Sequence, residues 1–261
     1  MSTSVYSPTV ASDTKPLHMA FFDLPIEHHD FTDESANLGW SNSAGKRAFD
    51  LAVAAPALLL SLPILVGIAV VIRASSDGPV LFRQTRMGKS AQPFTIYKFR
   101  TMRPAHNGPS VTRKGDARLT KLGLLLRRLK LDELPQLYNV VRGDMSLVGP
   151  RPKVIGHELR ELPCRPGITG AATLLFAREE DLLLHIPEDQ VEHFTVKVLH
   201  PIKARLDRVY AQECNFFTDA KILAQTALRL GRRQAITSLP ELASLYPAVA
   251  PISPPFDSAA R

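Results

Sequence analysis

The sequence predicts an α+β fold: a small, helix-rich domain with a short β-hairpin, anchored by an N-terminal apolar helix. Three observations lead to this prediction. A long apolar segment lies at 48–72, two short strand-like segments flank a glycine turn near residue 88, and leucines recur at helical spacing after residue 118. Because the helical segments outnumber the strands, we expect the fold to be mostly helical.

Charge and composition divide the chain into three parts. Residues 1–45 are polar and lack sustained periodicity, so we expect a disordered acidic arm. This arm carries six carboxylates against one lysine, although the net charge of the chain is +7. The body at 46–230 is therefore strongly basic, which suits nucleotide phosphates, acidic lipids or nucleic acid. Residues 231–261 contain several prolines and are predicted to form a loosely packed tail.

Two kinds of processing are not expected. The chain has only two cysteines, Cys164 and Cys214, which argues against a disulfide framework and fits a reducing compartment. The first residues lack a basic region followed promptly by an apolar run, so we expect no signal peptide.

The apolar segment at 48–72 carries one charge, Asp50. A straight helix of this length, rising about 1.5 Å per residue, would cross the hydrocarbon core of a membrane. Pro56 and Pro63 lie inside the segment, and an interior proline removes a backbone hydrogen bond and bends a helix. Basic residues flank the segment at both ends, so the positive-inside rule assigns no orientation. A spanning helix and a bent helix that returns to the same leaflet are about equally supported.

A β-hairpin is predicted after this segment. Val80–Arg83 and Phe94–Arg100 resemble short strands joined through the turn at residues 88–90. Lys98 and Arg100 lie on the second strand. Such residues ordinarily form a solvated basic edge, but beside a phosphate site they become candidate ligands.

The next predicted helix, at 118–131, is amphipathic. Its leucines recur at helical spacing among basic residues, at Leu119, Leu122, Leu126 and Leu129. Such a helix could pack on a globular core, or it could lie in anionic headgroups with its leucines facing the lipid. Because the helix follows a membrane-entering segment, we favour the interfacial position.

An adjacent carboxylate pair, Asp132 and Glu133, follows this helix among several basic side chains. Carboxylates among cations are typical of sites that handle a metal-bound phosphate, where acids act as nucleophile or Mg²⁺ ligand and cations neutralise phosphoryl oxygens. The following Leu134-Pro135 predicts a new helix, which would place Asp132 near its N-cap and favour the ionised carboxylate. The alternative, in which Asp132 only caps the helix and Glu133 is solvated, is equally compatible with the spacing.

Proline and glycine mark two loops in the C-terminal half. Gly149–Pro152 is predicted to be a rigid loop that presents Arg151, whose planar guanidinium suits a phosphate. Arg165–Gly170 is predicted to be a turn, and two helices are expected beyond it, at 204–214 and 217–230.

Several separate motifs occur in a defined order along the body of the chain. They are KRAFD at Lys46–Asp50, GPVLFRQTRMGK at Gly78–Lys89, FTIYKFRTM at Phe94–Met102, LDELPQLYNVVRGDMSLVGPRP at Leu131–Pro152 and RPGITG at Arg165–Gly170. This series resembles the signature of the bacterial sugar transferases, the monotopic phosphoglycosyl transferases that start glycan assembly on a polyprenyl phosphate. The resemblance extends from about residue 46 to about residue 230.

The resemblance implies an enzyme that transfers a sugar 1-phosphate from a UDP-sugar to undecaprenyl phosphate and releases UMP. It implies that Asp132 is the nucleophile, forming an aspartyl-phosphosugar intermediate, and that Glu133 and Asp132 bind Mg²⁺. Four basic residues are expected to hold substrate phosphates: Arg127, Arg151, Lys98 and Arg100.

The resemblance also implies a membrane arrangement, with a re-entrant helix at 46–73 that breaks at Pro63. The body would then lie on the cytoplasmic face of the bacterial inner membrane, with anionic lipids as additional partners. The chain departs from the family pattern in two places. Leu62 precedes Pro63 where serine is frequent, and residues 171–184 replace an Asn-Gly-Arg-type loop, which leaves the sugar open. A homodimer is possible, and the sequence does not decide it.

Two rival functions come from other classes. A non-catalytic membrane tether or scaffold of a polysaccharide-assembly complex would use the apolar segment as an anchor and the basic surface to gather partners. A nucleic-acid-binding protein is suggested only by the isoelectric point of about 9.6. We expect no nucleic-acid partner, because no nucleic-acid module is recognisable and the apolar segment argues against one.

Overall fold

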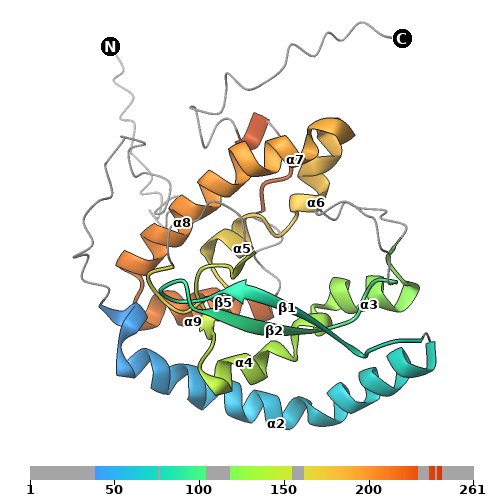
Figure 1. Cartoon of the computed structure of the whole chain (residues 1–261). Helices are drawn as coiled ribbons and strands as arrows, with labels where there is room; N and C mark the ends of the chain where they lie inside the picture. Colours follow the sequence, from blue (N-terminus) through green and yellow to red (C-terminus); the bar gives the residue numbers. More distant parts are fainter. Residues whose placement is uncertain are drawn as a thin grey trace, which may run out of the picture.

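The computed structural model describes residues 39–75, 77–103, 118–154, 162–228, 235–238 and 240–242. A long helix, α2, runs along one side of the molecule, a β-hairpin crosses its middle, and the C-terminal helices cover the opposite side (Figure 1). In chain order the elements are η1 Trp40–Asn42, α2 Ala44–Ser75, β1 Leu81–Met87, β2 Pro93–Phe99, α3 Lys121–Leu129, η2 Leu131–Glu133, α4 Gln136–Arg142, β3 Ser146–Val148, β4 Lys153–Val154, β5 Gly167–Thr169, α5 Ala171–Leu175, α6 Glu179–Leu182, η3 Leu183–His185, η4 Glu188–Gln190, α7 Val191–Phe194, η5 Thr195–Leu199, α8 His200–Glu213 and α9 Phe216–Ala227. The predicted mixed helix-and-sheet class is confirmed.

Helix α2 is longer than the predicted apolar segment and is continuous. Pro56 and Pro63 both lie inside it, so the helix is not interrupted at Pro63. Figure 1 shows that α2 curves along the lower edge of the molecule. Near the second proline, Ser61 Oγ donates a hydrogen bond to Leu58 O at 2.9 Å. Because Pro63 has no N–H, the carbonyl of the next residue, Leu59, lacks its usual helical donor. The re-entrant course of this helix stays a prediction.

The charges at the start of α2 are buried in protein, not exposed at its flank as the sequence interpretation assumed. Lys46 Nζ lies 3.0 Å from Asp50 and 2.7 Å from Asp219 of α9, and all three side chains are at most 4% exposed. Asp50 also accepts hydrogen bonds from Ser146 Oγ and Leu147 N, both in β3. This buried ion network therefore joins α2 to β3 and α9.

The hairpin prediction is confirmed, with a first strand longer than expected. Strands β1 and β2 pair antiparallel, with Gln84 opposite Ile96, and the short β4 adds to the other side of β1. A second, parallel pair joins β3 to β5. The segment predicted as a turn, Arg165–Gly170, thus contains a strand, and a side chain at Gly167 would clash with the backbone of Gly149. This close approach fixes the loop that carries Arg151.

Helix α3 is shorter than predicted, and its leucine stripe faces the protein. Leu126 is 2% exposed and belongs to a core cluster with Ile72 of α2 and Phe99 of β2, against which Leu122 also packs. The stripe that favoured an interfacial helix is therefore a core face. Two other leucines of α3, Leu124 and Leu125, are each 51% exposed.

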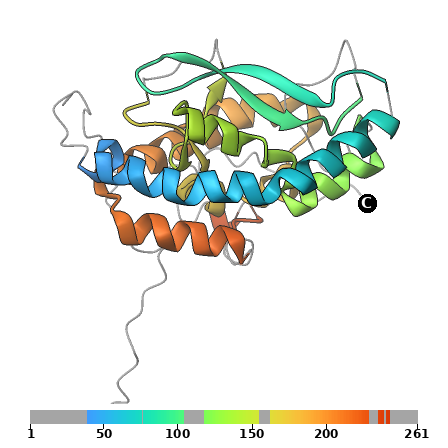
Figure 2. The same ribbon diagram turned by 90° about the horizontal axis from the view of Figure 1, so that it is seen from below.

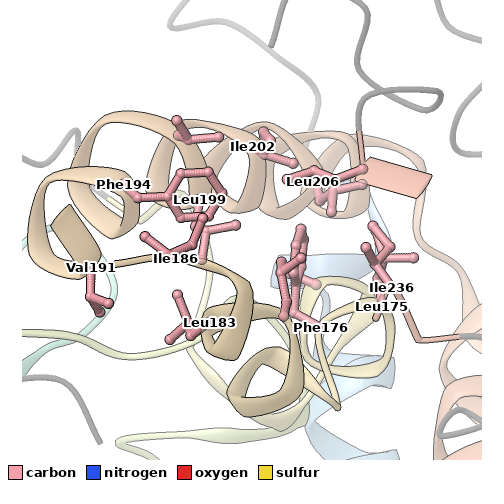
Figure 3. Close-up of a cluster of buried hydrophobic side chains, with 14 residues drawn as sticks. Leu175, Phe176, Leu183, Ile186, Val191, Phe194, Leu199, Ile202, Leu206 and Ile236 are labelled. Carbon is pink, nitrogen blue, oxygen red and sulfur yellow. The ribbon is translucent and has the colours of Figure 1, made fainter. Parts of the chain in front are cut away.

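The largest apolar cluster lies among the C-terminal helices, which pack α5, α6 and η3 against α7, η5 and α8 (Figure 3). Leu183, Phe194 and Ile202 approach one another from separate elements in this cluster. Ile236, assigned to the loosely packed tail, is fully buried here. The two predicted C-terminal helices are confirmed as α8 and α9.

The predicted arm at 1–45 extends too far toward the C-terminus. Residues 40–42 form η1, and α2 begins at Ala44. Trp40 packs on Phe49 and Phe216 and donates its indole N–H to Asp219 at 2.8 Å. Residues 1–38 lie outside the described part of the chain, as do 243–261 of the predicted tail.

Candidate active site

The carboxylate pair lies in a tight reversal between two helices. Helix α3 starts at Thr120, whose hydroxyl accepts a hydrogen bond from Gly123 N, and it ends at Lys130, which has a left-handed φ of 59°. The chain then forms η2, which contains Asp132 and Glu133, before α4 begins. The N-cap of α4 is Pro135, so Asp132 does not cap this helix; it lies in the first turn of η2, whose N-cap is the left-handed Lys130. The left-handed turn at the start of η2 orients the pair.

A buried asparagine fixes the hairpin against this reversal. Asn139 of α4 is fully buried, donates to Thr95 O at 2.8 Å and accepts from Tyr97 N at 3.3 Å. These bonds hold β2 beside α4. Lys98, the next residue of β2, reaches Glu133 with an Nζ–Oε1 distance of 2.7 Å. The structure thus brings Lys98 together with the carboxylate pair, and its role as a phosphate ligand stays a prediction.

The Lys98–Glu133 pair is mostly shielded, with side chains 23% and 18% exposed. Burial alone would raise the pKa of Glu133, but Lys98, Lys130 and Arg151 outweigh it and lower this pKa from 4.5 to about 2. The pKa of Lys98 is lowered by burial, an effect that Glu133 opposes and Arg151 adds to. Glu133 is therefore ionised at neutral pH.

This pair predicts a specific pH dependence of stability. Because the pKa of Glu133 is about 2 in the folded protein and 4.5 as a model value, its contribution to stability is full above pH 4.5 and disappears as the pH falls toward 2. We expect Glu133→Gln to have a lower thermal midpoint than the parent at neutral pH, with a difference that shrinks between pH 4.5 and 2. This difference in thermal midpoint is measured by thermal unfolding of the detergent-solubilised proteins at pH values from 7 down to 2. Glu188→Gln, at an exposed position, is the control, and a difference independent of pH would contradict the assignment.

Asp132 has a different environment from its neighbour. It is 8% exposed, and its Oδ1 atom is buried without a hydrogen-bond partner among the described residues. Burial and the charge of Glu133 raise the pKa of Asp132, while Lys98, Lys130 and Arg127 oppose this rise. A buried acceptor without a partner costs free energy in the empty site. Asp132 Oδ1 is thus placed to contact a ligand.

Gln136, one turn beyond Asp132, shares this property. It is 2% exposed, and its Nε2 donor is also buried without a partner in the described structure. The site therefore holds one unpaired acceptor and one unpaired donor within the first residues after the left-handed turn.

Arg151 lies between the carboxylate pair and a second group of charges. It is exposed, and its charge acts on Glu133 and Lys98 on one side and on Asp207 and Lys203 on the other. Two ion pairs make up the second group, Lys153–Asp207 at 3.2 Å and Lys203–Glu179 at 2.6 Å. Arg151 is thus within electrostatic reach of Glu133, and its predicted role as a phosphate ligand stays a prediction.

Arg86 of β1 holds the loop that presents Arg151. Its guanidinium donates twice to Gln84 Oε1, at 3.0 and 2.6 Å, and once to Pro152 O at 3.3 Å. Burial and the charge of Arg151 lower the pKa of Arg86 from 12.5 to about 10. Two guanidinium groups held this close together favour a bound anion.

The other two predicted phosphate ligands have protein partners. Arg127 of α3 pairs with Glu180 of α6 at 3.0 Å, while remaining within electrostatic reach of Asp132. Arg100, one residue beyond β2, donates to Asp77 O at 2.6 Å in the turn after α2. This bond connects Arg100 to that turn.

Comparison with known proteins identifies the family. The model of the family described as "Bacterial sugar transferase" matches residues 41–233. The chain belongs to the bacterial sugar transferase family. The matched region contains every predicted site residue of this sugar transferase and all the elements from α2 to α9.

Curated relatives of this sugar transferase agree with the family assignment. The chain is similar to the UDP-glucose:undecaprenyl-phosphate glucose-1-phosphate transferase of Escherichia coli (strain K12), 39% identical over 196 residues, which cover 70% of this chain and 39% of that protein. A protein of the same name from Caulobacter vibrioides is 45% identical over 139 residues, 49% of this chain and 52% of the relative. The UDP-N-acetylgalactosamine-undecaprenyl-phosphate N-acetylgalactosaminephosphotransferase of Aeromonas hydrophila is 40% identical over 148 residues, 52% of this chain and 35% of the relative. The matched part thus spans about half the length of these relatives or less.

Sequence reasoning missed several charged residues of the sugar transferase site. Glu179, Glu180, Lys203 and Asp207 lie in segments where no motif marked them, and they reach the site only through the packing of α6 and α8. Two missed residues do lie in quoted motifs, Arg86 in GPVLFRQTRMGK and Gln136 in LDELPQ. Their positions inside these motifs could have marked Arg86 and Gln136 as candidate site residues.

The carboxylate pair of this sugar transferase suits a Mg²⁺ ion shared with a substrate. Among the described residues, no group of three or more His, Cys, Asp or Glu side chains could hold a metal. Mg²⁺ is commonly bound through one or two carboxylates, with water and substrate phosphates completing its coordination. The unpaired Asp132 Oδ1 next to the ionised Glu133 fits such a site.

Proposed function

We propose that this sugar transferase moves a sugar 1-phosphate from a UDP-sugar to undecaprenyl phosphate, with release of UMP. The names of the three relatives support this proposal, because all of them combine a UDP-sugar with undecaprenyl phosphate. Those names differ in the sugar, glucose in two and N-acetylgalactosamine in one. The sugar is left to experiment.

The observation that carries the proposal is the placement of Asp132. Its Oδ1 is buried and unpaired, beside a Glu133 that is paired to Lys98 and ionised. A carboxylate with a raised pKa is a more basic and hence stronger nucleophile, provided that it is ionised when it reacts. Asp132 therefore suits the role of nucleophile, and Glu133 suits the role of a Mg²⁺ ligand.

The proposed reaction has two displacement steps. In the first, an Asp132 oxygen attacks the phosphorus that bears the sugar, and the phosphoanhydride bond to UMP breaks, so that UMP leaves with the electron pair. In the second, an oxygen of undecaprenyl phosphate attacks the same phosphorus, and the bond to Asp132 breaks. The products are undecaprenyl diphosphate sugar and the free carboxylate. Dividing the exchange in this way lets one site serve a soluble and a lipid substrate in turn.

The cations around the pair are proposed to stabilise the charge on the transferring phosphate. Arg151 lies within electrostatic reach of Glu133 and Lys98, and Arg86 fixes the loop that carries it. A bound Mg²⁺, held by Asp132 and Glu133, would offset the repulsion between a carboxylate and a diphosphate. Lys98 keeps Glu133 ionised and in place.

A direct assay tests the proposed function. Purified protein is incubated with undecaprenyl phosphate and a panel of UDP-sugars, and UMP release is measured. We expect UMP release with at least one sugar and dependence on both substrates and on Mg²⁺. No UMP release with any member of the panel would contradict the proposal and favour the tether.

We also propose that α2 enters the membrane and leaves by the same face, with the body on the cytoplasmic side. Helix α2 is long and apolar enough to cross a membrane, yet both of its ends pack on the same body: Lys46 in the buried ion network and Ile72 against Phe99 and Leu126. Figure 2 shows α2 running in front of the body along its length. Between its ends, Leu60 is 80% exposed. A spanning helix would carry one end to the far side of the bilayer, away from its contacts. The packing of both ends supports the re-entrant arrangement.

Cysteine labelling tests this topology. In a background with Cys164 and Cys214 replaced by alanine, Ser12→Cys reports on the arm and Gln212→Cys, at an exposed position of α8, reports on the body. We expect a membrane-impermeant maleimide to label neither site in intact spheroplasts and both after the membrane is opened. Labelling of Ser12→Cys but not Gln212→Cys in intact spheroplasts would show a spanning helix instead.

A further inference from the structure

Arg127, which the sequence predicts to bind a substrate phosphate, forms an ion pair with Glu180. Arg127 Nη2 lies 3.0 Å from Glu180 Oε1, and the two residues are separated by 53 positions. Glu180 belongs to 171–184, the segment in which this chain departs from the family pattern. A carboxylate and a phosphate bind a guanidinium through the same N–H edges, so they compete for it.

Helix α6 does not depend on Arg127 for its position. Its last residue, Leu182, is fully buried in the C-terminal core, and the following Leu183 is 1% exposed. Glu179 also fastens this turn to Lys203 of α8 at 2.6 Å. The Glu180 side chain can therefore release Arg127 while α6 stays in place.

The Arg127–Glu180 pair is also weak enough to exchange. The two side chains are 30% and 45% exposed, and exposed ion pairs contribute little to stability because water competes for both partners. A diphosphate carries more charge than one carboxylate and can accept two parallel hydrogen bonds from an arginine. Binding of a diphosphate should therefore displace Glu180 from Arg127.

We propose that Glu180 is a positioning residue that holds Arg127 in the empty site and gives it up to the incoming diphosphate, so that Glu180 sets the affinity for the nucleotide. This inference rests on the proposed function, because it takes Arg127 as a ligand of the substrate phosphates. The acidic side chain serves as an internal substitute for the substrate anion.

The test measures binding of UDP, which carries both phosphates and no sugar. The full-length protein in detergent micelles is titrated with UDP and Mg²⁺ by isothermal calorimetry. We expect Glu180→Gln to bind UDP about two- to fivefold more tightly, the range by which exposed ion pairs are coupled. Asp181→Asn is the control, because it removes a negative charge from the next residue, which pairs with Arg178 instead of Arg127. It should leave the affinity for UDP unchanged.

A double-mutant cycle distinguishes a specific effect from a general one. Arg127→Ala should weaken UDP binding, and adding Glu180→Gln to it should produce no tightening, because the competition acts through Arg127. Unchanged or weaker binding by Glu180→Gln, or the same tightening without Arg127, would overturn the inference.

The two proposals fail in different ways. If the parent protein releases UMP in the sugar panel but Glu180→Gln binds UDP like the parent, the proposed function stands and the role of Glu180 is wrong. If no UDP-sugar supports UMP release, the proposed function fails whatever the affinities. In the kinetic assay, Glu180→Gln should lower KM while kcat stays within about twofold of the parent, since removing a ground-state competitor alters binding and not the chemical step.

Discussion

Asp132→Asn should abolish UMP release, lowering turnover by about 10⁴-fold or more, the scale seen when an enzyme loses its nucleophile. The amide keeps the size of the side chain but has no ionised oxygen to attack the phosphate. The structure gives no compensating nucleophile at this position, because the neighbouring Glu133 is engaged by Lys98 at 2.7 Å. UMP release and the intact mass of the protein after incubation with UDP-sugar alone measure the effect. The parent should gain the mass of a sugar phosphate, and the variant should not.

Membrane association and folding are the controls for this variant. Both should persist in Asp132→Asn, and Asp189→Asn, which changes an exposed carboxylate in η4, should keep normal UMP release. Near-normal turnover by Asp132→Asn would exclude the covalent route. Loss of turnover with normal support of glycan assembly in cells would instead favour the non-catalytic tether.

Asp219→Ala should cause the largest loss of stability, about 3–5 kcal/mol, the range for breaking a buried ion pair from one side. Asp219 is fully buried and accepts hydrogen bonds from Trp40 at 2.8 Å and Tyr210 at 2.6 Å, in addition to its 2.7 Å contact with Lys46. The substitution leaves Lys46 with one partner fewer and deprives the Trp40 indole N–H of its acceptor, while Tyr210 Oη keeps Val148 O at 3.0 Å. Thermal unfolding followed by the fluorescence of Trp40, the single tryptophan of the chain, reports directly on this network.

A second replacement separates charge from packing in this network. Asp219→Asn keeps the size of the side chain and an acceptor for Trp40 and Tyr210 but removes the charge. It should recover part of the stability lost in Asp219→Ala, because Lys46 keeps its 3.0 Å contact with Asp50. Asp189→Asn again serves as the exposed control. A loss below about 1 kcal/mol in Asp219→Ala would mean that the network contributes little to holding α2 against β3 and α9.

Local patterns in the sequence located the longer elements and suggested the chemical centre. The apolar residues located α2, α3, α8 and α9, with boundaries that moved by one to four residues. Alternation around Gly88 located the hairpin. The carboxylate pair was found because two acids among many cations are unusual, and this contrast is visible without a fold. Each of these signals arises from neighbouring residues.

The partners of the charged side chains were decided only by the tertiary structure. From the sequence, Lys46 and Asp50 appeared to lie at the end of a membrane segment, but both are buried, and Lys46 contacts both Asp50 and Asp219. The leucine pattern of α3 favoured an interfacial position, but Leu126 and Leu122 pack beside Ile72 and Phe99 in the core.

Before folding, Asp132 and Glu133 are adjacent and chemically similar, and their spacing assigned neither a distinct environment. The left-handed turn at Lys130 and the bonds of Asn139 place Lys98 against Glu133, while Asp132 Oδ1 stays buried and unpaired. The sequence alone thus pointed to the carboxylate pair as the chemical centre and located the long helices and the hairpin. Which acid is paired, which arginine is held by Glu180 and how both ends of α2 meet one body were decided by long-range packing. The reason is that the free energy of a buried charge depends on the partners and the solvent exclusion that the complete fold supplies.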